Sequence, residues 1–119
     1  MFPPTILAVE DDLGMLESYQ VLLQDEYDLI TAETGAEALE VLLTRSINLI
    51  ILDILLPDIS GIDILRKAKS IDDRIEVIMV SGVGEVKIAV EAMKLGAYDY
   101  TLKPVEIEEL ISNYCLVPF

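Results

Sequence analysis

Acidic residues stand at the ends of two apolar, strand-like segments. Three acids, Glu10 to Asp12, follow residues 5–9, and Asp53 ends residues 48–53. If these two strands are neighbours in a parallel sheet, their ends lie about 5 Å apart, so two or three carboxylates converge on one small pocket. Like charges ~4 Å apart cost roughly 4 kcal/mol at an effective dielectric constant near 20. A cation would relieve this repulsion, and the pattern therefore favours a metal site.

The same acids also have a purely structural explanation, because acids after strands often cap the helices that follow. For Asp12 we prefer that explanation. For Asp53 it fails locally, because residues 54–57, which end in Pro57, do not begin a helix. A charged residue at the end of the apolar run 49–52 needs either a partner or a function.

The chain contains no histidine and a single cysteine, Cys115. The lack of histidine excludes histidine acid–base catalysis, Ser-His or Cys-His nucleophile pairs and histidine metal sites. Oxygen atoms must therefore hold any metal, which favours a hard cation, Mg²⁺ or Mn²⁺. One cysteine cannot form an internal disulfide, which suits a reducing cytoplasm.

Length and composition favour one soluble domain over residues 1–119. A chain of 119 residues fits one domain, and 53% hydrophobic residues predict a packed core. No run of about 20 apolar residues predicts a membrane helix, and no signal peptide is evident. We therefore expect a cytoplasmic location.

The net charge of −14, from 8 basic and 22 acidic residues, should repel nucleic acid. We expect no direct nucleic-acid contact by this chain. If the biological output is transcription, the DNA-binding part lies elsewhere.

Apolar runs alternate with helix-length stretches along the chain. The runs predict strands at residues 5–9, 28–32, 48–53, 75–80 and 98–102. Between them, apolar residues recur at three- and four-residue spacing, as in the stripe that ends at Met93. Five strands alternating with helices predict an α/β fold, a three-layer doubly wound parallel sheet with both faces covered. Ligands of such sheets bind outside the carboxyl ends of the strands.

Several residues mark the ends of the predicted helices. Thr34 followed by Glu37 is typical of a capping box that opens the second helix. Gly96 is expected to end the fourth helix, and Pro104 separates the last strand from the last helix. The fifth helix is expected from about Val105 to Tyr114.

Four motifs, in order from about residue 5 to about residue 113, resemble those of response-regulator receiver domains of two-component signalling. Residues 6–12 resemble the first strand and acidic pair of that family. Residues 52–61 resemble its phosphoacceptor loop, with Pro57 four and Gly61 eight residues after Asp53. Residues 80–82 resemble its hydroxyl switch, and residues 96–104 its last strand with the Lys-Pro end. The resemblance implies a flavodoxin-like strand order, 2-1-3-4-5.

The resemblance also implies a role for each matching residue. Asp53 is the expected acceptor of a phosphoryl group from a sensor histidine kinase or phosphotransfer protein, in a Mg²⁺-dependent reaction. The chain is then a signalling domain and not an enzyme. Phosphoryl oxygens are expected to contact Lys103, whose bond to Pro104 is expected to be cis, and the Ser81 hydroxyl. The implied metal ligands are Asp11, Glu10 through water, Asp53 and the main-chain carbonyl of Leu55.

The implied conformational switch couples Ser81 to an aromatic residue on the last strand. Register relative to Lys103 favours Tyr100, although Tyr98 lies on the same strand face. In the family, the face formed by the fourth helix, fifth strand and fifth helix is the usual output or homodimer surface. Residues 89–100 resemble the receivers of enhancer-binding transcriptional activators. The apolar end, residues 115–119, is expected either to continue in a longer protein or to pack unusually.

The lifetime of an aspartyl phosphate depends on how water reaches it. By the resemblance, the positions two after Asp53 and two after Ser81 flank that approach. They are Leu55 and Val83, which cannot orient a water molecule through hydrogen bonds. We expect slow self-dephosphorylation.

Three other functions share some of these sequence features. A haloacid-dehalogenase-type phosphatase needs a second Asp two residues after the nucleophile, where this chain has Leu55. A nucleotide-binding turn at Gly82 and Gly84 would need a third glycine at position 87, where this chain has Lys87. Gly82 is better explained as leaving room for the phosphoryl group. The third is a receiver-like interaction module that is never phosphorylated, and such modules usually lack the acceptor Asp or the Lys.

Overall fold

The computed structural model describes residues 3–82 and 84–114. In this part of the chain, strands and helices alternate from β1 to α5. The strands are β1 (Thr5–Val9), β2 (Asp28–Ala32), β3 (Leu49–Asp53), β4 (Glu76–Ser81) and β5 (Asp99–Leu102). The helices are α1 (Leu13–Leu23), α2 (Gly35–Thr44), α3 (Gly61–Ile71), α4 (Val86–Lys94) and α5 (Ile107–Tyr114).

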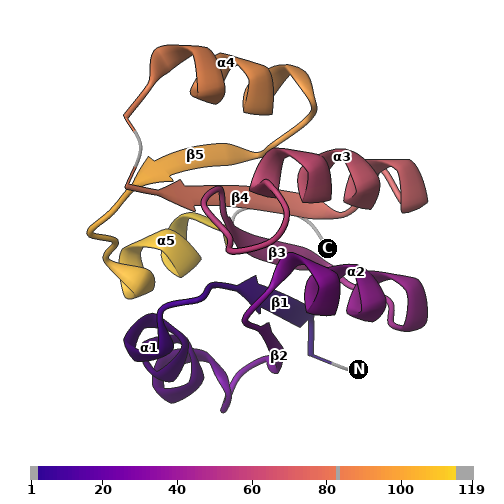
Figure 1. The fold of residues 1–119 in the computed structure, drawn as a ribbon. Coiled ribbons are helices and arrows are strands. Elements are labelled where there is room, and N and C mark those ends of the chain that lie inside the picture. Colours follow the sequence, from indigo (N-terminus) through magenta and orange to yellow (C-terminus); the bar gives the residue numbers. More distant parts are fainter. Residues whose placement is uncertain (1–2, 83, 115–119) are drawn as a thin grey trace.

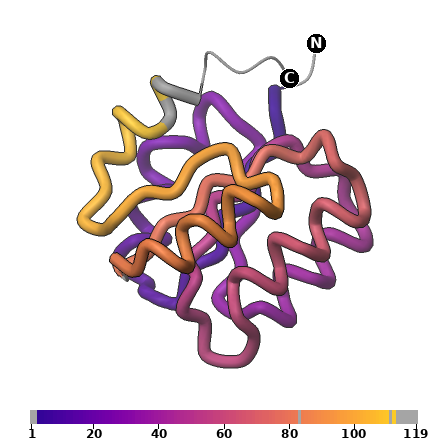
Figure 2. The backbone as a smooth tube through the Cα atoms, turned by 90° about the horizontal axis from the view of Figure 1, so that it is seen from above, coloured from indigo at the N-terminus to yellow at the C-terminus, as the bar shows by residue number. Residues whose placement is uncertain are grey.

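All strand pairs are parallel, and the order across the sheet is β2-β1-β3-β4-β5. This confirms the predicted doubly wound sheet and its flavodoxin-like order. The helices α1 and α5 pack on one face of the sheet, and α2, α3 and α4 on the other (Figure 1; Figure 2). Because β1 and β3 are direct neighbours, their carboxyl ends meet at one edge, as the acidic pattern requires.

The sheet lies between two apolar cores, one on each of its faces. One core joins β-strand residues to α1 and α5 through Tyr19 and Leu110, and the other joins them to α2, α3 and α4 through Leu42, Leu65 and Ala92. Every residue of β3 is buried. The nearly continuous apolar sequence of β3 and β4 thus reflects burial on both faces.

The predicted helix boundaries are mostly confirmed. Gly96 adopts a positive φ of 100° after α4, a conformation in which glycine carries no side-chain strain. The Thr34 hydroxyl accepts a hydrogen bond from the Glu37 N–H at 3.1 Å. The reciprocal half of the capping box differs, because Glu37 accepts from the N–H of Glu33.

Some boundaries differ by a residue or two from the sequence prediction. The third, fourth and fifth strands each begin one residue later than expected, and β4 also ends one residue later. Helix α5 begins at Ile107 because the Glu106 carbonyl accepts its first helical hydrogen bond, from Leu110. The expectation for the tail, residues 115–119, lies outside the described residues. Within the described ranges, no helix is long and apolar enough to cross a membrane.

Candidate functional site

The carboxyl ends of four strands bring the predicted site residues to one edge of the sheet. Glu10 directly follows β1, Asp53 ends β3, Ser81 ends β4 and Lys103 directly follows β5. Parallel pairing aligns these ends, since Asp53 is in register with Val80, the residue before Ser81. The strand alternation visible in the sequence is therefore what assembles the site.

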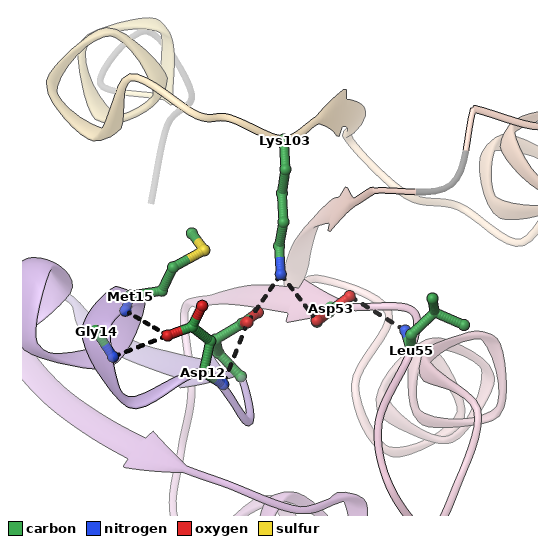
Figure 3. A network of polar contacts seen from close by, with 7 residues as sticks. Asp12, Gly14, Met15, Asp53, Leu55 and Lys103 are labelled. Atoms are coloured by element: carbon green, nitrogen blue, oxygen red, sulfur yellow. Dashed lines mark hydrogen bonds and ion pairs between the residues drawn. The ribbon is translucent and has the colours of Figure 1, made fainter.

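Lys103 lies between two buried carboxylates. Its Nζ donates to Glu10 Oε1 at 2.8 Å. It also donates to Asp53 Oδ2 at 3.1 Å (Figure 3). Glu10 is 2% exposed and Asp53 4% exposed. Charges this deeply buried need partners, and the lysine supplies one for both. The Lys103–Pro104 peptide bond is cis, as expected.

A third carboxylate makes the site strongly acidic. Carboxylate oxygens of Glu10, Asp11 and Asp53 all lie within 4.8 Å of one another. Asp11 is exposed, so the cluster opens to solvent on its side. Three acids face one lysine, which leaves an excess of negative charge. Such a set of carboxylate oxygens fits a hard cation, and Mg²⁺ prefers oxygen ligands and retains several waters.

Burial and hydrogen bonding together set the pKa values of Glu10 and Lys103. Burial raises the pKa of the Glu10 carboxyl from 4.5 to about 7, and the nearby Asp53 adds to the rise while the hydrogen bond from Lys103 opposes it. Burial alone would lower the pKa of Lys103, but its hydrogen bonds to Glu10 and Asp53 outweigh that effect and raise it. Lys103 is therefore cationic at neutral pH.

The raised pKa of Glu10 predicts a pH-dependent stability of the metal-free protein. The folded state holds the Glu10 proton more tightly than the unfolded state. The contribution of Glu10 to the free energy of unfolding is fully present below pH 4.5 and is lost as the pH rises through about 7. In Mg²⁺-free buffer, Glu10→Gln should therefore be more stable than the wild type at pH 8, by up to about 3 kcal/mol, and equally stable near pH 4. Urea unfolding at both pH values measures this.

Two further results complete that test. Glu40→Gln, which removes an exposed carboxylate from α2, controls for the loss of one charge. A Glu10→Gln variant that is less stable than the wild type at pH 8 would contradict the assigned direction.

Both carboxylate oxygens of Asp53 have hydrogen-bond donors. Oδ2 accepts from Lys103, and Oδ1 accepts from the Leu55 N–H at 3.1 Å (Figure 3). The Leu55 side chain is 60% exposed. The Leu55 N–H thus joins the start of the loop after β3 to the carboxylate of Asp53.

The close contacts around Gly61 explain why a glycine stands eight residues after Asp53. A Cβ at this position would lie 2.3 Å from the main-chain oxygen of Asp53 and 2.7 Å from Cα of Ile54. The Gly61 N–H donates to the Ile54 carbonyl at 2.9 Å. Any side chain would therefore prevent the loop from closing behind the site.

Ser81 is fully buried at the end of β4. Its main-chain carbonyl accepts from the Lys103 N–H at 2.9 Å, so the backbones of these two predicted site residues are joined directly. A Cβ built on Gly82 would meet no atom within 4 Å. The space at Gly82 is thus open on the side where a side chain would stand.

The two tyrosines near the site differ in their surroundings. Tyr100, in register with Met79, is half-buried and packs against the core beneath α4. Tyr98 precedes β5 and is 38% exposed. Tyr100 therefore has the closer contact with the layer that contains α4.

Two other acids have structural roles. The Asp12 carboxylate accepts from the N–H groups of Gly14 and Met15, so it caps α1 as expected (Figure 3). Sequence analysis missed Asp58, whose carboxylate caps the distant helix α2. Its partners lie 22 and 23 residues earlier, and only the turn signal at Pro57 marks the segment.

A family model, the response regulator receiver domain, matches residues 6–114. Sporulation initiation phosphotransferase F of Bacillus subtilis is 32% identical over 111 residues, which cover 92% of this chain and 90% of that protein. Transcriptional regulatory protein ZraR of Escherichia coli O157:H7 is 34% identical over 106 residues, or 88% of this chain. The chain spans only about a quarter (24%) of the length of that regulator.

A solved structure supports the same assignment. The CheY-like response regulator receiver domain protein from Methanospirillum hungatei superposes with a TM-score of 0.90 at 32% identity. The match covers 96% of this chain and 92% of that one.

Proposed function

Because the chain belongs to the response regulator receiver family, whose domains accept a phosphoryl group and switch conformation, we propose that Asp53 is its phosphoacceptor. The observation that carries the proposal is the position of the Asp53 carboxylate. It is buried at the end of β3, bonded to the Lys103 ammonium and close to the carboxylates of Glu10 and Asp11.

The proposed reaction is a direct phosphoryl transfer. A carboxylate oxygen of Asp53 attacks the phosphorus atom of the donor in line, and the bond from phosphorus to the leaving atom of the donor breaks. The leaving group departs with the electron pair, and an acyl phosphate remains on Asp53. Because Lys103 Nζ lies 3.1 Å from Asp53 Oδ2, its positive charge is close to the place where the phosphoryl oxygens would lie.

Receiver domains bind Mg²⁺ in an acidic pocket. Here the proposed ligands are Asp11, Glu10 through water, Asp53 and the main-chain carbonyl of Leu55, with Mn²⁺ as a substitute. When bound, the ion neutralises negative charge on the transferring phosphoryl group. Glu10 and Asp53 are buried, and the exposure of Asp11 leaves the site open to a donor.

The proposed switch is built from Ser81 and Tyr100. The Ser81 hydroxyl would bind a phosphoryl oxygen, and the movement of β4 would reach α4 through Tyr100, which packs against the same core. Tyr98 is the second candidate for the aromatic residue of this switch, because its side chain is more exposed than that of Tyr100.

Receiver domains interact with histidine kinases or phosphotransfer proteins and can dimerise. For this chain the proposed donor is such a protein in the cytoplasm. The proposed homodimer or output surface is the α4-β5-α5 face, where Val90, Met93 and Leu102 are exposed. The net charge of −14 argues against direct nucleic-acid contact.

This function is tested by phosphorylation with acetyl phosphate, measured as intact mass. The wild type should gain one phosphoryl group with Mg²⁺ and none with EDTA. Asp11→Asn, which removes one proposed ligand, should need roughly tenfold more Mg²⁺ for the same labelling rate. Labelling that proceeds equally well in EDTA would contradict the proposed metal site.

A further inference from the structure

The loop between β3 and α3, residues 54–60, carries Leu55 and contains no helix or strand. Each end of this loop is fixed by a hydrogen bond near Asp53. The Leu55 N–H donates to Asp53 Oδ1, and the Gly61 N–H donates to the Ile54 carbonyl. The middle of the loop must be held by other contacts.

Asp58 supplies the long-range hydrogen bonds among those contacts. Its Oδ1 accepts from the Gly35 N–H at 2.8 Å, and its Oδ2 accepts from the Ala36 N–H at 2.9 Å. The first N–H groups of a helix have no partner within the helix, and a carboxylate at this end also interacts favourably with the helix dipole. Asp58 therefore caps α2 from another segment of the chain.

The capping of α2 is divided between two side chains. Asp58 takes the first two N–H groups, and Thr34 Oγ1 takes that of Glu37. The Ala38 N–H already bonds to the Thr34 carbonyl. Every N–H of the first turn thus has a partner, and the two hydrogen bonds to Asp58 link the start of α2 to the loop after Asp53.

The approach of the loop to the helix is close. A Cβ at Gly35 would lie 2.8 Å from Cβ of Ile59 and 3.1 Å from Asp58 Oδ1. Glycine at position 35 therefore lets the loop reach the helix end. Leu56 and Ile59 also pack against the core, so the loop has an apolar anchor that does not depend on Asp58.

We propose that Asp58 is a positioning residue which, by capping α2, holds the loop after Asp53 in place for Mg²⁺ binding. The inference rests on the proposed function, in which the Leu55 carbonyl and the Asp53 carboxylate are metal ligands. A tether at Asp58 fixes the loop three residues beyond Leu55, so the carbonyl is already in position before the ion arrives. Hydrogen bonds from Gly35 and Ala36 also lower the pKa of the Asp58 carboxyl, so the tether is charged at neutral pH.

The test is calorimetric titration of the folded variants with MgCl₂, together with amide hydrogen exchange. Asp58→Ala should bind Mg²⁺ roughly tenfold more weakly, as is usual when a residue that orients a ligand is removed. Its Leu55 and Ile59 amides should exchange faster in metal-free buffer. Asp58→Asn keeps an acceptor oxygen for an α2 N–H and should recover part of the affinity.

Two variants separate positioning from general stability and charge. Thr34→Ala removes the other cap of α2 and should lower the melting temperature, yet leave the Mg²⁺ dissociation constant unchanged. Asp72→Ala removes the same unit of charge from the far end of α3, where the carboxylate bonds to Arg74. It should also leave Mg²⁺ affinity unchanged.

The possible results are distinct. If Asp58→Ala and Asp58→Asn bind Mg²⁺ as the wild type does, or if Thr34→Ala weakens binding equally, the positioning role is wrong while Asp53 can remain the acceptor. If the wild type binds no Mg²⁺, or Asp53→Asn binds it unchanged, the proposed metal site fails and the role of Asp58 fails with it.

Discussion

Asp53→Asn is expected to abolish phosphorylation by acetyl phosphate in Mg²⁺, while the wild type gains one phosphoryl group. The amide nitrogen of asparagine has no available lone pair, and its oxygen is a far weaker nucleophile than a carboxylate oxygen. The loss should therefore be complete in intact mass, and not a partial slowing.

Loss of folding does not explain the expected result for Asp53→Asn. The substitution removes one of two buried carboxylates that share Lys103, which lowers repulsion in the metal-free state. The variant should be at least as stable as the wild type in EDTA, by thermal unfolding.

Asp12→Asn is the matched control, because Asp12 is a neighbouring acid whose carboxylate caps α1. Asparagine caps helices as well as aspartate does, so this variant should label normally. Equal labelling of Asp53→Asn and the wild type would place the acceptor elsewhere and refute the central proposal.

Leu55→Glu is expected to shorten the lifetime of the phosphorylated state by roughly tenfold, which is less than a fully positioned general base contributes. The Leu55 side chain is 60% exposed, and its N–H bonds to the Asp53 carboxylate. A carboxylate at this position can hydrogen-bond a water molecule close to the phosphoryl group, whereas leucine cannot. Intact mass, followed over time after removal of the donor, measures the rate.

The control is Leu55→Met, which keeps an apolar side chain of similar volume and should retain the slow wild-type rate. The second position expected to flank the water, Val83, lies outside the described residues, so Leu55 carries this test. Phosphate loss within seconds in the purified wild type, with no phosphatase present, would mean that these side chains do not control hydrolysis.

Much of the fold, and which strand ends meet at the candidate site, could be predicted from the sequence. Strand and helix periods are local properties, so the alternation of elements is readable without a structure. Parallel strands bring their carboxyl ends to one edge, which is why acids that follow residues 5–9 and end residues 48–53 were expected to meet. Gly96 and the Thr34 cap were predictable for the same reason, since each acts on its own few neighbours.

Tertiary structure alone decided how the site residues interact. Lys103 pairs with Glu10 and Asp53, which lie 93 and 50 residues away, and no local pattern encodes that pairing. The pKa of Glu10 rises because many distant residues together exclude water from it. The role of Asp58 is also decided by the tertiary structure, because its carboxylate caps a helix that begins more than 20 residues earlier in the chain, where it accepts a hydrogen bond from Ala36, 22 residues away. Sequence periodicity specifies which residues form each element, but desolvation and long-range hydrogen bonds exist only once those elements have packed.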